Sequence, residues 1–410
     1  MYRLLTHYAR LIRNRRYFPL WAGQLISNLG DTLHYIALVV WVYQRTGSSL
    51  AVSGAVFFEV VPVIVLAPVA GVVIDRLPRK AVLVGTDVTR AALVIGLLFT
   101  TELWQIYLII TLLTAAGTFF NPAVNATLPT LLDAEDLLAA NSVSWSTGRL
   151  VQIIGSALAL GVIQITGAEA AFVFNASTFL ISAVFLLLLP IPRGQRVETR
   201  GWRGFVADAR EGLRFARHDW FVSRLVVVQA MASLSVGATS ALLVVLAQQH
   251  YQLPPGGFGS FILSIGVGAL IGPFLLGWLT RGDYQHSHWL FGPYVIRGVG
   301  DILLAVAAAP PIAWLLLFIY GLNTSSGMIV YQTWLQRHVP DAMRGRVFTW
   351  LDVVWNVMKV ISLGLGGWLA EQASVEIVYY VGGTLLMISG LVGILTLRSQ
   401  QPFLKDTAHL

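Results

Sequence analysis

Apolar stretches of about 20 residues recur along nearly the whole chain, and this pattern limits the possible folds more than any other feature. A helix needs about 20 apolar residues to cross the hydrocarbon core of a bilayer. Only 11% of the residues are charged, whereas soluble domains carry about 25%. A chain with so few charges excludes a soluble enzyme, a nucleic-acid-binding protein and a disordered scaffold. The sequence predicts an all-α membrane protein that crosses the lipid bilayer many times.

Twelve transmembrane helices are predicted, each bounded by charges, glycine or proline. They cover residues 18–42, 50–74, 81–101, 104–127, 141–166, 169–189, 222–250, 257–280, 287–309, 311–335, 347–371 and 376–397. The long connection after the sixth helix divides the chain into an N-terminal six-helix bundle (1–189), a cytoplasmic linker (190–221) and a C-terminal bundle (222–410). From about Phe205, apolar residues of the linker recur at helical spacing, which predicts an amphipathic helix on the membrane surface.

The 27 Lys and Arg residues are distributed unevenly between the two sides of the predicted membrane. Of these, 22 lie at the termini and on or beside the even-numbered loops, four lie within the spans, and Arg45 is the one basic residue on the odd-numbered loops. Cytoplasmic loops carry such an excess, so we expect a cell-membrane protein with both termini in the cytoplasm. The formal net charge of +7 therefore reflects topology and predicts no nucleic-acid partner. The chain has no Cys, and we expect no cofactor, no metal and a monomer.

The two predicted bundles resemble each other in sequence. A shift of 207 residues places Arg90 on Arg297 and Asn125 on Gln332, and Gly71 falls within one residue of Gly277. Two parallel six-helix repeats are typical of transporters that rock around a binding site near the membrane midplane. We therefore expect two pseudo-symmetric bundles with a substrate cavity between them.

The segment GVVIDRLPRK (71–80) resembles the loop 2–3 signature of the major facilitator superfamily, G-x-x-x-D-R-x-G-R-[RK], with Pro78 in place of the second Gly. Segments 27–48, 122–132 and 335–347 are similar to the macrolide-efflux and enterobactin-exporter branch of that superfamily. The resemblance implies the major facilitator fold and a latch of charges on the inner side of the membrane. These gating and motif charges are Asp75, Arg76, Arg79, Lys80, Asp87, Arg90 and Lys359.

Asp31 is the first candidate for proton coupling. Gln24, Asn28, Asp31 and Tyr35 are spaced 4, 3 and 4 residues apart, which places them on one face of the first helix. A polar stripe on a spanning helix is expected to face a water-filled cavity, because lipid offers no hydrogen bonds. Asp31 either takes up and releases a proton there or attracts a cationic substrate, or else it caps or braces a neighbouring helix. For His34 we favour a packing role.

Glu59 is the second candidate for proton coupling, because it lies near the middle of the second helix. Lys359, at the midpoint of the eleventh helix, is its available partner, and the superfamily resemblance implies that these two helices face each other. A bridge formed in one state would act as a gate, whereas a permanent bridge would be structural.

Two further charge pairs are expected to be structural. Asp87 and Arg90 lie three residues apart toward the cytoplasmic end of the third helix, and Arg297 and Asp301 lie four apart on the ninth. Both spacings allow pairing on one helical face. Asp352 is expected near the cytoplasmic surface, so it ranks below Glu59 as a candidate for proton coupling.

Substrate contacts are expected from polar and aromatic side chains at mid-depth on helices that face the cavity. The candidates are Gln24, Asn28, Tyr35, Asn121, Asn125, Gln229, Asn323, Tyr331, Gln332 and Trp355. On the fifth helix, the exporter pattern G-P-x-x-G-G is replaced by a stretch with Ser156 and Ala159, so the expectation of export rests on the resemblance.

These features predict a secondary active transporter that exports amphipathic small molecules, such as drugs, macrolides or siderophore-like compounds, in exchange for protons by alternating access. Drug resistance is the biological role that this implies. Import or lipid translocation by the same fold is the alternative. A membrane-embedded enzyme would need a cluster of catalytic or metal-binding residues, and an ATP-driven pump would need G-x-x-x-x-G-K-[ST]; neither motif is present. We therefore expect no catalytic residues.

Overall fold

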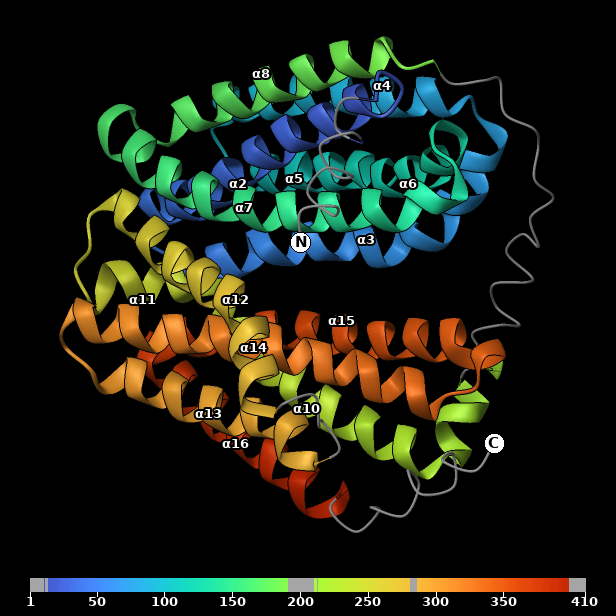
Figure 1. The fold of residues 1–410 in the computed structure, drawn as a ribbon. Helices are drawn as coiled ribbons and strands as arrows, with labels where there is room; N and C mark the ends of the chain where they lie inside the picture. Colours follow the sequence, from blue (N-terminus) through green and yellow to red (C-terminus); the bar gives the residue numbers. More distant parts are fainter. Residues whose placement is uncertain (1–10, 12–13, 191–209, 212, 281–285, 398–410) are drawn as a thin grey trace. The chain divides into compact units, whose positions relative to one another are not determined.

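The computed structural model describes residues 11, 14–190, 210–211, 213–280 and 286–397. Within these residues, twelve segments are helical, long enough and apolar enough to cross a membrane, which confirms the predicted fold class (Figure 1). The helices of the first half are α2 (Phe18–Thr46), α3 (Ser49–Arg76), α4 (Arg79–Gly96), α5 (Leu103–Gly117), α6 (Phe120–Leu131), α7 (Ala134–Thr166) and α8 (Ala168–Leu187). Those of the second half are α10 (Trp220–Ala241), α11 (Leu243–Gln249), α12 (Phe258–Thr280), α13 (Ser287–Val306), α14 (Pro310–His338), α15 (Asp341–Gln372) and α16 (Val375–Leu397).

Two predicted helices are interrupted. The fourth span is divided into α5 and α6 at Thr118 and Phe119. Pro122 explains this break, because proline has no N–H to donate four residues back and its ring clashes with that carbonyl, here the carbonyl of Thr118. The seventh span is divided into α10 and α11 at Leu242, whose ψ of 6° departs from helical geometry.

The chain divides into two compact units. Unit 1 comprises Met1–Gly47, Ala55–Phe205 and Pro254–Leu263, and unit 2 comprises Ser48–Gly54, Val206–Leu253 and Ser264–Leu410. Two continuous helices are therefore shared, because α3 begins in unit 2 and α12 begins in unit 1.

In unit 1, α8 packs along both α2 and α4, and α2 also packs against α7 (Figure 1). Gly30 allows the close approach of α2 to α8. A Cβ atom at this position would overlap the Thr178 hydroxyl and the Asn175 side-chain oxygen. Real side chains do not tolerate such overlap, so the absence of a side chain at Gly30 sets the distance between the two helices.

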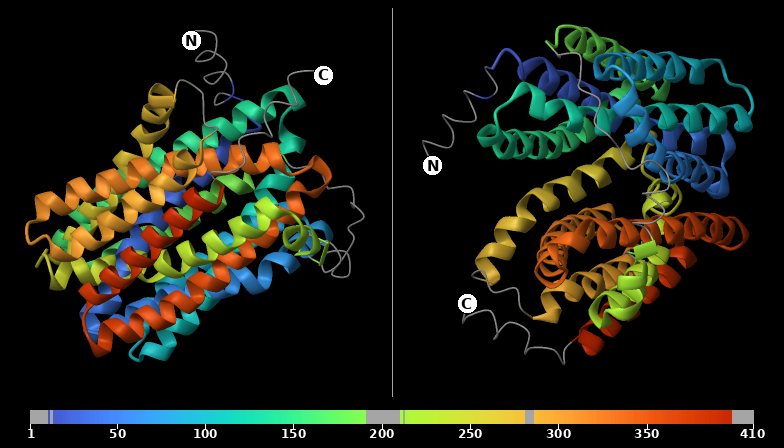
Figure 2. Two further views of the ribbon diagram at one scale, coloured as in Figure 1. Left: turned by 90° about the horizontal axis from the view of Figure 1, so that it is seen from below. Right: turned by 90° about the vertical axis from the view of Figure 1, so that its right-hand side faces the viewer.

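Unit 2 repeats the packing plan of unit 1. The contacts of α16 with α10 and α13 correspond to those of α8 with α2 and α4, and α10 also packs against α15 as α2 does against α7. Figure 2 shows the unit 2 helices, coloured from yellow-green to red, against one another in both views. Gly298 of α13 and Gly383 of α16 meet back to back, since a Cβ on Gly298 would lie 2.5 Å from the Gly383 carbonyl oxygen.

The predicted amphipathic helix of the linker lies partly outside the described residues, which resume at 210. Residues 213–218 are helical. Ala216 is buried in the apolar core of unit 2 together with Leu225 and Val347. This end of the linker therefore belongs to the packed unit.

Candidate functional site

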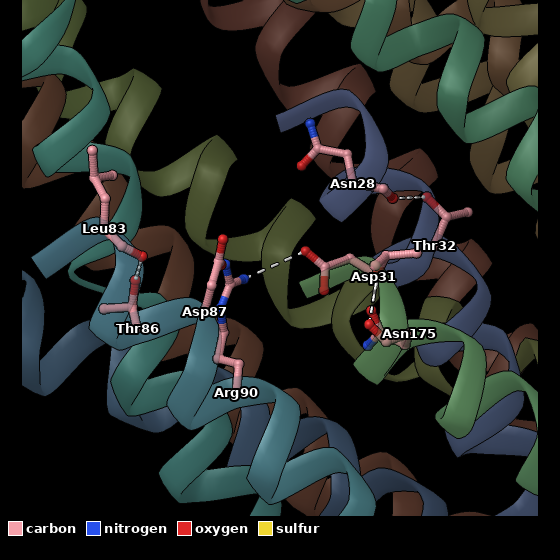
Figure 3. Close-up of polar contacts among 9 residues, drawn as sticks. Asn28, Asp31, Thr32, Leu83, Thr86, Asp87, Arg90 and Asn175 are labelled. Atoms are coloured by element: carbon pink, nitrogen blue, oxygen red, sulfur yellow. Dashed lines mark hydrogen bonds and ion pairs between the residues drawn. The ribbon is translucent and has the colours of Figure 1, made fainter. Parts of the chain in front are cut away.

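Three charged side chains from two helices of unit 1 meet near the middle of α2 and α4. Nη2 of Arg90 donates a hydrogen bond to Oδ1 of Asp87, and Nη1 of Arg90 lies 3.6 Å from Oδ2 of Asp31 (Figure 3). One guanidinium is thus shared by two carboxylates. With both carboxylates ionised, the Asp31–Arg90–Asp87 cluster carries a net charge of −1.

Exposure separates the two carboxylates of the Asp31–Arg90–Asp87 cluster. The Asp87 side chain is fully buried and that of Arg90 is 9% exposed, whereas the Asp31 side chain is 43% exposed. Asp87 is therefore committed to its arginine, because an unpaired buried carboxylate is strongly unfavourable. Asp31 is therefore the member of the cluster that can exchange a proton with its surroundings.

Aromatic rings hold the arginine in place, and two polar side chains of α8 lie beside its carboxylate partners. The Arg90 guanidinium lies over the rings of Phe179, at 4.1 Å from the centroid, and Phe120, at 4.8 Å. Contacts of this kind with aromatic rings stabilise a cation that is shielded from water. From α8, Asn175 lies beside the Asp31 carboxylate (Figure 3). Ser182 of the same helix lies beside Asp87.

The cluster corrects the predicted position of Asp87 and Arg90. We expected this pair toward the cytoplasmic end of its helix, as part of a latch between the halves of the protein. In the structure both residues lie near the middle of the span Arg79–Phe99, and their contacts are made within unit 1. The pairing of Asp87 with Arg90 is confirmed, while the contact with Asp31 was missed.

A cavity of about 350 Å³ lies between α2 and α7, on the same side of α2 as two residues of the predicted polar stripe. Gln24 and Asn28 line it, and Asp31 follows Asn28 by one helical turn. Nη1 of Arg149 donates to Oε1 of Gln152 at its α7 wall, at 3.1 Å. The remaining lining residues are Trp21, Leu25, Ser144, Thr147 and Gly148. Tyr35, the last residue of the stripe, is half-buried.

The other predicted cavity residues have different environments. Asn121 and Asn125 are exposed on α6. Asn323, Gln332 and Trp355 are half-buried in unit 2, and the Asn323 amide donates to the carbonyl of Ile319 on its own helix.

Gln229 and Tyr331 depart from the expected open position. Both are buried. The Tyr294 hydroxyl donates to Oε1 of Gln229 at 2.7 Å, and Tyr331 is hydrogen-bonded to the same side chain. Because these contacts join α10, α13 and α14, the two residues act here as packing residues of unit 2.

The described motif charges donate to backbone carbonyls of other segments inside unit 1. Arg79 donates to the Ala126 carbonyl of α6 at 2.6 Å, and Lys80 donates to the Leu189 carbonyl just after α8 at 3.1 Å. The contact of Lys80 lies at the carbonyl end of α8, where cations are favoured. Asp75 and Arg76 lie in the last turn of α3, and their side chains are outside the described part of the structure. The bonds of Arg79 and Lys80 brace unit 1, and the latch between the two halves stays a prediction.

Glu59 and Lys359 are half-buried on α3 and α15. Glu59 belongs to unit 1 and Lys359 to unit 2. The bridge between them therefore stays a prediction.

Unit 2 contains the counterpart of the buried arginine. Nε of Arg297 lies 3.7 Å from Oδ2 of Asp301, which confirms the predicted pair. The Arg297 guanidinium also lies 3.9 Å from the ring centroid of Tyr320 and donates to the Ser240 hydroxyl at 3.2 Å. His34, for which we favoured packing, is buried with its ring 5.3 Å from that of Phe172.

Sequence reasoning missed Asn175 as a site residue. Its signal was present, because an asparagine inside the apolar run Ala168–Leu187 needs a polar partner. Among the residues that the structure describes, no three His, Asp or Glu side chains are grouped so that they could hold a metal ion.

The fold and the family are also indicated by comparison with known proteins. The family model of the Major Facilitator Superfamily matches residues 20–357. The chain is 29% identical to an uncharacterized MFS-type transporter, YfiS of Bacillus subtilis, over 93% of both chains. It is 23% identical to macrolide efflux protein A of Streptococcus pyogenes, over 92% of this chain and 95% of the relative.

The fold is also found in solved structures. The nucleoside transporter NupG superposes with a TM-score of 0.78 over 93% of this chain and 99% of that chain, at 13% identity. This likeness concerns the fold alone. The helices, their repeated packing plan and the family match lead to one conclusion: the chain belongs to the major facilitator superfamily of membrane transporters.

Proposed function

We propose that this protein is a secondary active transporter of the cell membrane that exports amphipathic small molecules in exchange for protons, by alternating access. Both termini lie in the cytoplasm in this proposal, because the basic residues are concentrated on that side. The similarity to a macrolide efflux protein supports export of a bulky, partly apolar substrate. The protein works as a monomer and contributes to drug resistance.

The observation that carries this proposal is the sharing of Arg90 by a buried and a half-exposed carboxylate. When Asp31 is ionised, it attracts the guanidinium. When Asp31 takes up a proton, that attraction is lost, while Arg90 stays bound to the buried Asp87. Each proton thus changes the charge of the cluster from −1 to zero without exposing an unpaired charge to the interior.

The cavity between α2 and α7 supplies the substrate site of this proposal. Its volume of about 350 Å³ lies within the range of about 300–1,000 Å³ that is usual for small-molecule sites. Trp21 and Leu25 provide apolar surface, while Gln24 and Asn28 provide hydrogen-bonding groups. This mixture fits an amphipathic ligand. Glu59 is the second proton carrier, and the polar residues Asn121 and Asn125 are further contacts.

Import is the competing direction of transport. Import, like lipid translocation by the same fold, is kept as an alternative because the exporter pattern of Pro and paired Gly is replaced in α7, where Ser156 is fully buried.

Everted membrane vesicles test the proposal directly. A panel of lipophilic drugs and siderophores is offered with and without a proton gradient. We expect gradient-dependent accumulation inside the vesicles that is lost in Asp31→Asn and in Glu59→Gln. Asp133→Asn, an exposed carboxylate at the start of α7, is the matched control and should transport normally. Unchanged proton coupling in both Asp31→Asn and Glu59→Gln would refute the assignment, and accumulation only in right-side-out vesicles would favour import.

A further inference from the structure

His250 lies where the chain leaves α11, and both of its ring nitrogens face oxygen atoms of other helices. Nδ1 is 3.0 Å from Oε1 of Glu376 in α16, and Nε2 is 2.8 Å from the backbone carbonyl oxygen of Ala307, directly after α13. All three residues belong to unit 2. We propose that His250, Glu376 and the Ala307 carbonyl form a second proton-binding site, which we call the His250 site.

The chemistry of the two oxygens requires a charged imidazole. A backbone carbonyl and an ionised carboxylate only accept hydrogen bonds. A neutral imidazole has one N–H and so satisfies one of the two oxygens, while its other nitrogen presents a lone pair to the second. The imidazolium has an N–H on each nitrogen and satisfies both. The bound ligand of the His250 site is therefore a proton.

The helix ends around the site favour the same charge state. Glu376 lies in the first turn of α16, where the helix dipole stabilises a negative charge, so the carboxylate is held in its accepting form. Ala307 is the C-cap of α13, where the dipole stabilises a positive charge. The imidazolium thus lies between a carboxylate and the negative end of a helix.

The neighbouring ionisable groups are engaged with other partners. The Tyr251 ring contacts the imidazole with centroids 4.8 Å apart. Its hydroxyl donates to the Leu304 carbonyl at 2.7 Å, and burial raises the pKa of Tyr251 to about 12, so it keeps its proton at neutral pH. Deeper on α13, Arg297 and Asp301 bind each other. On α16, Tyr379 and Tyr380 donate to the carbonyls of Thr239 and Ala305.

The position of the site in the chain gives the proton a structural effect. His250 ties the segment after α11 to the ends of α13 and α16, and three residues later, between Leu253 and Pro254, the chain passes from unit 2 into unit 1. There Gly256 packs tightly on α7, because a Cβ at this position would lie 2.6 Å from the Leu160 carbonyl oxygen. The segment from His250 to Gly256 is thus held at both ends. Loss of the proton from His250 releases the end at His250.

Hydrogen–deuterium exchange on the purified full-length protein tests this inference without any transport assay. Histidine changes charge between about pH 5 and 8, so wild type, His250→Gln and His218→Gln are compared at about pH 6 and about pH 8. His218 is the matched control, since it is exposed and its ring bonds to a carbonyl of its own helix. The proteins are compared with one another at the same pH, so the direct chemical effect of pH on the exchange rate cancels.

We expect protection of residues 243–258 to be higher in wild type than in His250→Gln at about pH 6, by about tenfold, and equal in the two proteins at about pH 8. His218→Gln should behave as wild type. Equal protection of wild type and His250→Gln at both pH values would overturn the inference.

A second variant keeps the test decisive if His250→Gln does not fold. Glu376→Gln retains the shape of the side chain but loses its charge, so the thermal midpoint of wild type should exceed that of this variant by about 2–4 °C at low pH only. An offset that does not change with pH would also overturn the inference. Because the Asp31–Arg90–Asp87 cluster is not involved, failure of the transport proposal leaves this result unaffected.

Discussion

The Asp31 carboxylate of α2 lies 3.6 Å from the guanidinium of Arg90 on α4, and the same guanidinium is bound to Asp87 one turn earlier on its own helix. The two carboxylates are chemically identical, yet one is fully buried and the other is 43% exposed. This difference in exposure assigns a structural role to Asp87 and proton exchange to Asp31.

Removing the arginine should therefore be more harmful than removing Asp31. Arg90→Ala leaves Asp87 buried without its cation, which costs about 3–5 kcal/mol. Asp31→Asn removes a half-exposed ion pair and should cost less than about 1 kcal/mol. Unfolding in mixed micelles measures both, with the exposed Arg337→Ala as control. Equal destabilisation by the two substitutions would contradict the assigned roles.

The close packing of α2 on α8 predicts a second effect. Gly30→Ala forces the new methyl group against Thr178 and Asn175, and such overpacking costs about 1–3 kcal/mol. Gly85→Ala on α4 is the matched control, because a Cβ there has nothing within 4 Å, and helix propensity should make it neutral or stabilising by up to about 1 kcal/mol. Thermal unfolding separates the two. Tolerance of Gly30→Ala would show that the helices are further apart.

The Arg297–Asp301 pair predicts energetic coupling inside unit 2. Replacing either residue leaves a buried charge, whereas Arg297→Leu with Asp301→Leu leaves none. The double variant should be less destabilised than the sum of the single variants, by about 0.5–3 kcal/mol. A double-mutant cycle of unfolding free energies measures this coupling. Simple additivity would mean that the contact at 3.7 Å contributes nothing.

Topology can be tested cleanly because the chain has no Cys. A single cysteine at Gly47, between α2 and α3, should react with a membrane-impermeant thiol reagent added outside intact cells. A cysteine at Arg15 should react only after the cells are opened. Labelling of both from outside, or the reverse pattern, would refute cytoplasmic termini.

The helices could be predicted closely because the bilayer imposes their length. The ends of α12 and α16 were predicted to within about a residue, since the length of the apolar run and the flanking polar, glycine or proline residues determine them. The break between α5 and α6 was missed, although Pro122 carried the signal.

The site was only partly accessible from the sequence. Spacing places Gln24, Asn28 and Asp31 on one face of α2, but it does not give the rotation of α2 relative to α4. That rotation depends on the packing of both helices on α8. The partners of His250 lie 57 and 126 residues away in the chain. No local pattern encodes such contacts, because they arise from tertiary packing.

The two shared helices have a mechanical consequence. Gly54 is the last residue of α3 assigned to unit 2, and Ser264 is the first residue of α12 assigned to unit 2. Because neither helix is interrupted there, the units are connected by stiff rods in addition to the linker. Bending of α3 and α12 at these positions is one way in which a displacement of one unit against the other can be absorbed, and a glycine (Gly54) and, on α12, Gly266 lower the resistance of each helix to it.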